Sequence, residues 1–250
     1  MFGGVADPTI EILAVRRIAG VGDPQAARPQ SLDEIVAVRE DFLRDYQDGA
    51  WARRYRAFVD RVRAAEARAG MGSAALSAAV ARSLFKLMSY KDEYEVARLH
   101  SSEEFRRALE QQFEGDFTLK FHLAPPLLAE RDAITGHLRK REFGPWMMRA
   151  FGVLAKFKGL RGTRFDIFGY LPERRQERRL IGDYETLIGA LLARLDARTA
   201  PLIAEIAALP LAMRGFGHVK ERNIEQALAR QEELLARLDA PEQVVQIQAA

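Results

Sequence analysis

The chain has 250 residues, of which 48% are hydrophobic and 29% charged, a composition typical of a globular protein that can bury a sizeable core. It contains no cysteine, which excludes disulfides, zinc–thiolate sites and cysteine-ligated iron–sulfur clusters within this chain. The formal net charge is +3, and we find neither a run of about 18 apolar residues nor a signal-peptide pattern. We therefore expect a cytoplasmic protein without membrane contact.

The first segments alternate between irregular and helical patterns. Glycines and prolines break residues 1–30 into an irregular lead-in. Ser31 and Glu34 form a capping box that predicts the start of a helix, which we expect Gly49 to end. A second helix is predicted from Trp51 to Arg68, antiparallel to the first.

The stretch from Leu84 to Arg98 combines bulky apolar residues at mostly helical spacing with a dense charged set. Ser73 is the predicted N-cap of the helix that leads into it. One interpretation is a solvated helix face with i,i+4 pairs such as Tyr94–Arg98 and Lys91–Glu95. The other is a ligand or interface site. The candidates for that site are Lys91, Asp92, Glu93, Tyr94 and Arg98.

A short strand pair interrupts the helices. Apolar and polar residues alternate in Phe117–Leu123, and His137–Phe143 provides the expected partner strand. We therefore predict a mainly α fold with a small β-hairpin over about residues 117–143. Residues 31–240 are expected to form a single helical domain, and residues 241–250 a frayed tail.

The second half returns to helical patterns separated by glycine-rich loops. Pro145 predicts the start of a helix. We interpret the apolar stripe of this helix as part of the core; it consists of Trp146, Met147, Phe151, Leu154 and Phe157. Further helices are predicted from Pro172 to Leu195, from Pro201 to Pro210, and from Val219 to Leu238.

Positive charge is concentrated between Arg139 and Arg179, where twelve Lys and Arg residues face four Asp and Glu residues, a net charge of +8. Such a region suits an acidic protein, a phosphate-bearing ligand or nucleic acid, and it is equally compatible with solvated helix faces. Two glycine-rich loops carry further ligand candidates, although structural turns are the simpler interpretation. Their polar side chains are Arg161, Arg164 and Asp166 in the first loop, and Arg214, His218 and Lys220 in the second.

The sequence shows little evidence of a catalytic or metal-binding motif. The four histidines form no H-x-x-x-H or H-E-x-x-H pattern, so we predict no metal site. His122, on the polar side of the predicted strand, is the one candidate for acid–base chemistry. The residues alone therefore identify no active site.

Several blocks of sequence, in order, carry a family resemblance. They include LFKLMSYKDEYEVARLH, FHLAPPLLAERDAITG, FGPWM, LRGTRFDIFGYLPERRQERRLI and LPLAMRGFGHVK. Together they resemble the C-terminal region of the fused indolepyruvate ferredoxin oxidoreductases, from about Ser31 to the late 230s. The resemblance implies oxidative decarboxylation of arylpyruvates to arylacetyl-CoA, with thiamine diphosphate, Mg²⁺ and [4Fe–4S] clusters in the full enzymes.

This chain departs from those enzymes because it has neither the G-D-G…N thiamine diphosphate motif nor any cysteine. The resemblance therefore implies an accessory C-terminal domain or subunit that is not catalytic alone, and whose expected partners are the catalytic modules and a ferredoxin. Arg174, Arg175, Arg178 and Arg179 are the predicted docking residues for an acidic ferredoxin. The alternative is a basic helical module without catalysis that binds an acidic partner or nucleic acid, the latter without any recognition motif in its support.

Overall fold

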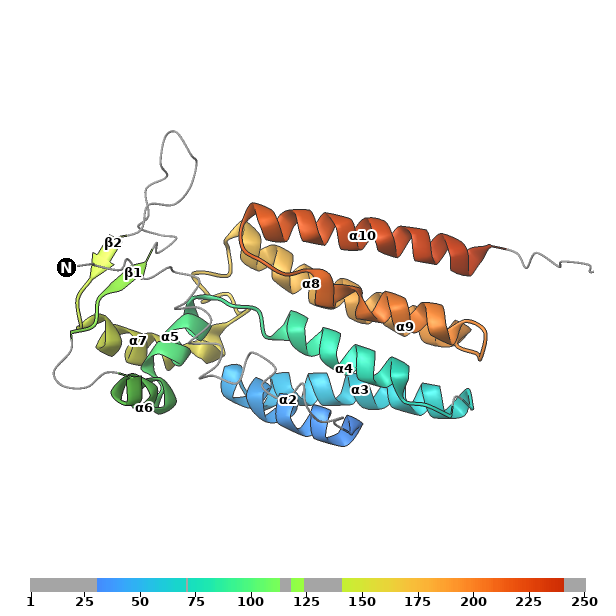
Figure 1. Ribbon diagram of the computed structural model, residues 1–250, viewed down its shortest axis with the longest axis horizontal. Helices are drawn as coiled ribbons and strands as arrows, with labels where there is room; N and C mark the ends of the chain where they lie inside the picture. Colours follow the sequence, from blue (N-terminus) through green and yellow to red (C-terminus); the bar gives the residue numbers. More distant parts are fainter. Residues whose placement is uncertain (1–30, 71, 113–117, 124–140, 241–250) are drawn as a thin grey trace, which may run out of the picture. The chain divides into compact units, whose positions relative to one another are not determined.

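The computed structural model describes residues 31–70, 72–112, 118–123 and 141–240. Within these residues it contains nine α-helices and one two-stranded antiparallel sheet (Figure 1), which confirms the mainly α fold with a small hairpin. No helix in this part of the chain has both the length and the apolar character needed to cross a membrane. The predicted lead-in, 1–30, and the predicted tail, 241–250, lie outside the described residues.

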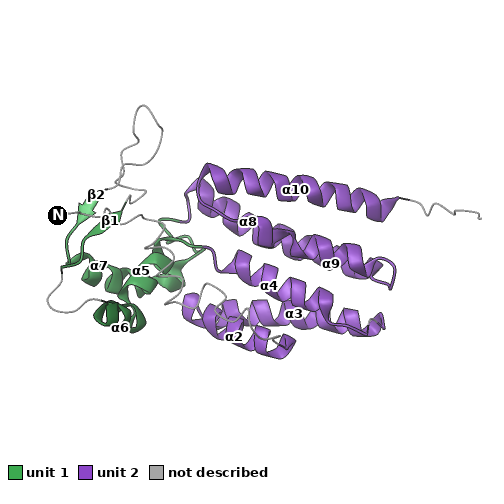
Figure 2. Ribbon diagram, viewed as in Figure 1, with its two compact units in different colours: residues 1–29, 91–168 green, residues 30–90, 169–250 purple. Residues whose placement is uncertain are grey.

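The chain divides into two compact units (Figure 2), and both contain residues of the range 31–240 that we expected to form a single domain. Unit 2 combines Gln30–Tyr90 with Gly169–Ala250, and unit 1 includes Lys91–Phe168, which is inserted between those two segments. The elements of unit 2 are α2 (Leu32–Tyr46), α3 (Gly49–Arg68), α4 (Ala75–Met88), α8 (Pro172–Leu191), the 3₁₀ turn η2 (Leu192–Arg194), α9 (Ala200–Ala208), the 3₁₀ turn η3 (Leu209–Ala212) and α10 (His218–Asp239). Those of unit 1 are α5 (Glu93–Ser101), α6 (Glu103–Gln112), β1 (Phe121–Leu123), β2 (Arg141–Phe143), α7 (Met147–Ala155) and the 3₁₀ turn η1 (Lys158–Leu160).

The first two helices of unit 2 begin at side-chain caps. The Ser31 hydroxyl accepts a hydrogen bond from the backbone N–H of Glu34, and the Glu34 carboxylate accepts one from the backbone N–H of Ser31, which confirms the capping box. The prediction that Gly49 ends this helix is wrong. Helix α2 ends at Tyr46, and Gly49 is the first residue of α3. The reason is Asp48, whose carboxylate accepts a hydrogen bond from the backbone N–H of Trp51 and so starts a new helix at once.

Helix α4 is the most buried element of unit 2 and packs against α2, α3, α8 and α9. Its predicted N-cap, Ser73, is wrong: the helix begins after Ala74, which offers no side-chain cap. Instead the buried carboxylate of Glu66 on α3 accepts hydrogen bonds from the backbone N–H groups of Leu76 and Ser77, at 2.9 and 3.1 Å. A neighbouring helix therefore satisfies donors that α4 cannot satisfy itself.

Two backbone carbonyls at and just after the other end of α4 are also satisfied by side chains of neighbouring helices. The indole N–H of Trp51 donates to the Met88 carbonyl at 3.2 Å, and the buried Tyr46 hydroxyl donates to the Tyr90 carbonyl at 2.7 Å. The stretch Leu84–Arg98 is accordingly not one continuous helix: α4 ends at Met88 and α5 begins at Glu93, in the other unit.

Unit 1 is built around the short hairpin and α7. β1 and β2 pair antiparallel, with Phe121 opposite Phe143 and His122 opposite Glu142, as the predicted hairpin requires. Phe121 also packs with Ala97 of α5 and with Met147 and Phe151 of α7 in one apolar cluster. Residues 124–140, which include the predicted turn and the first four residues of the predicted partner strand, lie outside the described residues.

The predicted core stripe of α7 is only partly correct. Met147 and Phe151 are buried, but 58% of Trp146 and 50% of Phe157 is exposed. Trp146 immediately precedes α7 and Phe157 lies in the turn after it, so neither belongs to the packed part of the helix.

Candidate functional site

The predicted site residues of unit 1 meet in a buried ion pair. Asp92 is the N-cap of α5, and its Oδ1 accepts a hydrogen bond from the backbone N–H of Glu95 at 2.8 Å. Arg161, which follows η1, donates to both oxygens of the same carboxylate, from Nε at 2.6 Å and from Nη2 at 2.9 Å. The two side chains are only 3% and 2% exposed. This bidentate geometry is the strongest that arginine and carboxylate form.

A second acidic residue of the same loop contacts α5 beside this pair. The Tyr94 hydroxyl donates to Asp166 Oδ1 at 3.3 Å, and the backbone N–H of Gly162 donates to Asp166 Oδ2 at 2.8 Å. The Arg161 guanidinium lies 5.6 Å from the centre of the Tyr94 ring. Burial, followed by the charge of Asp166, raises the pKa of Tyr94 well above its usual range, so this hydroxyl stays protonated.

We name these four residues, Asp92, Tyr94, Arg161 and Asp166, the α5–loop clasp. All four are buried. Both oxygens of Asp92 already accept hydrogen bonds from Arg161. A ligand could bind either of these buried charges only by breaking the ion pair. The geometry therefore favours a structural role for the clasp over the ligand-site interpretation.

The other candidates near α5 have surroundings of their own. Arg98 forms two 2.8 Å hydrogen bonds with Glu95 rather than the expected pair with Tyr94. Lys91 and Glu93 are half-buried, next to the N-cap. Arg164 is exposed, with its guanidinium 4.9 Å from the centre of the Phe165 ring. These residues remain candidates for contacts at the surface.

His122, the candidate for acid–base chemistry, is exposed on the hairpin. Its Nε2 lies 4.0 Å from a Glu142 carboxylate oxygen on the neighbouring strand. The ammonium of Lys120 bonds the other oxygen of Glu142 at 2.8 Å and lowers the pKa of that carboxyl. An exposed histidine beside an already paired carboxylate is a surface contact and has none of the burial that tunes catalytic groups.

In unit 2 the second glycine-rich loop lies beside a cluster of charged residues. Lys220 of α10 forms a close ion pair with Glu177 of α8, whose side chain is 10% exposed. Lys86 of α4 donates to the carbonyl of Met213 at 2.6 Å. Burial lowers the pKa of Lys86 to about 8, and the positive charges of Lys220 and Arg214 act in the same direction. The negative charge of Glu177 opposes this shift. This lysine is therefore partly neutral near physiological pH.

Two members of this cluster, Lys86 and Glu177, were not predicted as site residues. Lys86 is the one charged residue between Leu84 and Met88, an otherwise apolar run, and that isolation is the signal that could have identified it. The other loop candidates are exposed: Arg214 donates to the Leu211 carbonyl, and His218 is the first residue of α10.

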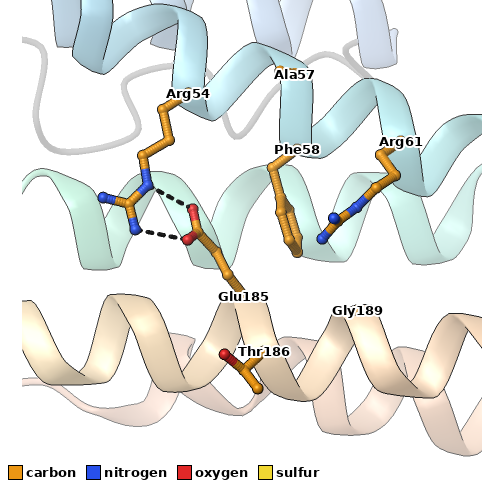
Figure 3. Close-up of a pocket in the computed structure, with 7 residues that line it drawn as sticks. All are labelled: Arg54, Ala57, Phe58, Arg61, Glu185, Thr186 and Gly189. Carbon is orange, nitrogen blue, oxygen red and sulfur yellow. Dashed lines mark hydrogen bonds and ion pairs between the residues drawn. The ribbon is translucent and has the colours of Figure 1, made fainter.

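An open pocket of about 710 Å³ lies between α3 and α8 (Figure 3). Arg54 and Glu185 bridge the two helices by hydrogen bonds of 3.0 and 2.6 Å. Further along, the guanidinium of Arg61 lies 4.6 Å from the centre of the Phe58 ring, beside Gly189. Within the described residues Arg61 has no carboxylate partner, so the pocket presents one unbalanced positive charge.

The predicted docking arginines lie in the first turns of α8. Arg175 and Arg179 are exposed, whereas Arg174 and Arg178 are half-buried. Arg178 donates to the Gly169 carbonyl, which fixes it against the start of the helix. Arg175 and Arg179, one turn apart, therefore form the accessible part of this basic surface.

The described residues bear on one part of the cofactor set of the oxidoreductases that the sequence resembles, namely the metal sites. They contain no group of three or more His, Cys, Asp or Glu side chains that could hold a metal ion. The full sequence contains no cysteine to ligate an iron–sulfur cluster.

Comparison with known proteins gave one result. The searches of curated proteins and of solved structures found no match. The model of one protein family, designated DUF6537 and described as a family of unknown function, matches residues 32–233. The matched range begins at the first residue of α2 and ends within α10, so it includes helices of both units. The chain belongs to this family, DUF6537.

Proposed function

We propose that this chain is an accessory C-terminal domain or subunit of an indolepyruvate (2-oxoacid):ferredoxin oxidoreductase. In this proposal the thiamine diphosphate, Mg²⁺ and iron–sulfur clusters belong to other modules. Those modules carry out the oxidative decarboxylation of arylpyruvates, in the cytoplasm. This chain supports their assembly or their contact with ferredoxin.

The observation that carries the proposal is the ordered series of sequence blocks between Leu84 and Lys220 that resemble that C-terminal region. Two of these blocks supply the α5–loop clasp: Asp92 and Tyr94 come from the first, Arg161 and Asp166 from the fourth. These two blocks therefore encode a buried link between segments that lie far apart in the sequence. The absence of cysteine from this chain agrees with cofactors on other modules.

The test is recovery of the tagged full chain from its host, followed by assay of iron, acid-labile sulfide and thiamine diphosphate in the recovered material. We expect a large partner that carries all three and reduces viologen when arylpyruvate and coenzyme A are added. The same complex reconstituted without this chain should lose assembly or turnover. Normal assembly and turnover without it would contradict the proposal.

A second candidate function is favoured by the exposed arginines of α8. A basic module without catalysis would use the same surface to bind an acidic protein or nucleic acid. Binding of duplex DNA at near-physiological salt, with a steep dependence on salt concentration, would favour nucleic acid over the oxidoreductase. Weak binding that disappears at that salt concentration would leave the first proposal in place.

A further inference from the structure

One face of α7 exposes large apolar side chains in a continuous stripe. Trp146, Val153 and Phe157 are 58%, 57% and 50% exposed. Their separations of seven and four residues place them on one side of a helix. The backbone is helical at Trp146 and at Lys156, on either side of α7, and Phe157 is the next residue, in the turn that leads to η1. We name these three residues the outer α7 stripe.

The outer α7 stripe is not a misplaced core face. The packed face of α7 is already complete, because Met147 and Phe151 are buried against Ala97 and Phe121. Apart from Arg149, α7 contains only apolar residues and glycine. A helix that is apolar all round is one that proteins bury on more than one side. The exposed side chains of Trp146, Val153 and Phe157 therefore offer a second contact surface.

The charges around the stripe indicate what covers it. Arg149 and Lys156 are exposed on α7 and immediately after it. Between Phe143 and Pro172 the sequence contains a single acidic residue, Asp166, which is buried in the α5–loop clasp. A second copy of this chain, packed face to face, would bring these like charges together, which is unfavourable. A surface with carboxylates would instead complement them.

We propose that the outer α7 stripe binds a partner protein through a contact surface that is apolar at its centre and carries Asp or Glu at its rim. Tryptophan and phenylalanine anchors inside a charged rim are the composition that concentrates binding energy in protein interfaces. The binding surface itself is argued from the residues of α7. The identity of the partner, namely the catalytic modules of the oxidoreductase, rests on the proposed function.

The test replaces Val153 in the full chain with the photocrosslinker p-benzoylphenylalanine, in the host cell. The side chain of Val153 is largely exposed, so the probe can be accommodated without repacking. The matched control carries the same probe at Gln226, an exposed position on α10. Crosslinked peptides are identified by mass spectrometry, and the experiment is repeated in an Arg149→Glu/Lys156→Glu background.

We expect Val153, and not Gln226, to crosslink to an apolar peptide flanked by acidic residues. The charge reversal should lower the yield about tenfold, because it places like charges at the rim. Crosslinks only to a second copy, only to lipid, or equally from Gln226 would overturn the proposal, as would a yield unaffected by the reversal. An acid-rimmed partner other than the catalytic modules would support this surface and contradict the proposed function, so the two failures are distinguishable.

Discussion

Glu66 of α3 caps the start of α4 through Ser77. The carboxylate accepts hydrogen bonds from both the backbone N–H and the hydroxyl of Ser77, and Glu66 is only 4% exposed. Its other oxygen accepts the N–H of Leu76. A negative charge at a helix N-terminus is favoured both by these unsatisfied donors and by the helix dipole. The central helix of unit 2 therefore depends on a side chain of its neighbour to begin.

Replacement of this carboxylate should destabilise the protein. We expect Glu66→Ala to lower the free energy of unfolding by about 2–4 kcal/mol, because it leaves buried N–H groups at the start of α4 without acceptors. Urea-induced unfolding followed by circular dichroism measures the change. Arg68→Ala, two residues away and exposed, is the matched control and should change stability by less than about 0.5 kcal/mol. Equal effects of the two substitutions would contradict the capping role.

This cap also shows what could be predicted from the sequence and what could not. Ser31 and Glu34 lie three residues apart, so the pattern that starts α2 is local and was read correctly. Glu66 lies ten residues before Leu76, on a different helix, and no local pattern connects them. The local pattern therefore predicts the nearby Ser73 as the cap, although the structure uses Glu66.

The candidate site was predictable to a similar extent. Asp92, Tyr94, Arg161 and Asp166 were all selected from sequence, but as members of two separate sets. Asp92 and Arg161 are 69 positions apart, and only the fold brings them together. Trp146 and Phe157 were predicted as core because helical spacing identifies a shared face without showing whether that face is covered.

The Asp92–Arg161 pair gives a second prediction. Arg161→Ala should destabilise unit 1 by about 3–5 kcal/mol, because it leaves the Asp92 carboxylate buried without its partner. Hydrogen exchange should show the loss in α5 and the loop after η1. Arg164→Ala in the same loop is the control, since that side chain is exposed.

A double replacement separates the structural role of this pair from a ligand role. Asp92→Asn combined with Arg161→Met removes both charges, so it should be milder than Arg161→Ala alone. In the complex of the proposed function, full activity with restored stability would agree with a structural clasp. Restored stability with lost activity would point to a ligand at Asp92 or Arg161 instead.

The lowered pKa of Lys86 predicts how the stability of the folded protein depends on pH. Its pKa is about 8 in the folded protein and 10.5 when unperturbed, so the unfolded chain binds more protons between these values. Stability should therefore rise as pH increases from about 8 toward 10, by at most about 3 kcal/mol. Lys86→Met should remove this rise, while Lys156→Met, at an exposed position, should keep it. Urea midpoints at a series of pH values provide the measurement.

Above pH 10 the buried tyrosines should reverse the trend. Burial raises the pKa of Tyr55 and of Tyr184 far above 10, and their hydroxyls donate to the carbonyls of Ala81 and Ala207. The unfolded chain then loses protons that the folded chain keeps, so stability falls as pH rises. Tyr184→Phe should reduce this fall, at a loss of about 1 kcal/mol at neutral pH from the missing hydrogen bond. Absorbance near the tyrosinate band should show both hydroxyls titrating only on unfolding.

The basic surface of α8 gives the most direct test of contact with ferredoxin. Arg175 and Arg179 are its exposed members, whereas Arg178 bonds the Gly169 carbonyl and is better left unchanged. In the assembled oxidoreductase of the proposed function, Arg175→Glu/Arg179→Glu should raise the apparent KM for an acidic ferredoxin about tenfold at low ionic strength. Because salt screens exposed charges, the difference should shrink as ionic strength increases.

The matched control is Arg222→Glu/Arg237→Glu, which changes the net charge equally at two exposed positions of α10. If long-range net charge alone steered the ferredoxin, both double variants would raise KM to the same degree. A local docking surface predicts a large effect for α8 and a small one for α10, with kcat unchanged in both because electrostatic steering acts on association. An unchanged KM for the α8 variant at low ionic strength would rule out this docking surface, while leaving the structural role of the chain to be judged from assembly alone.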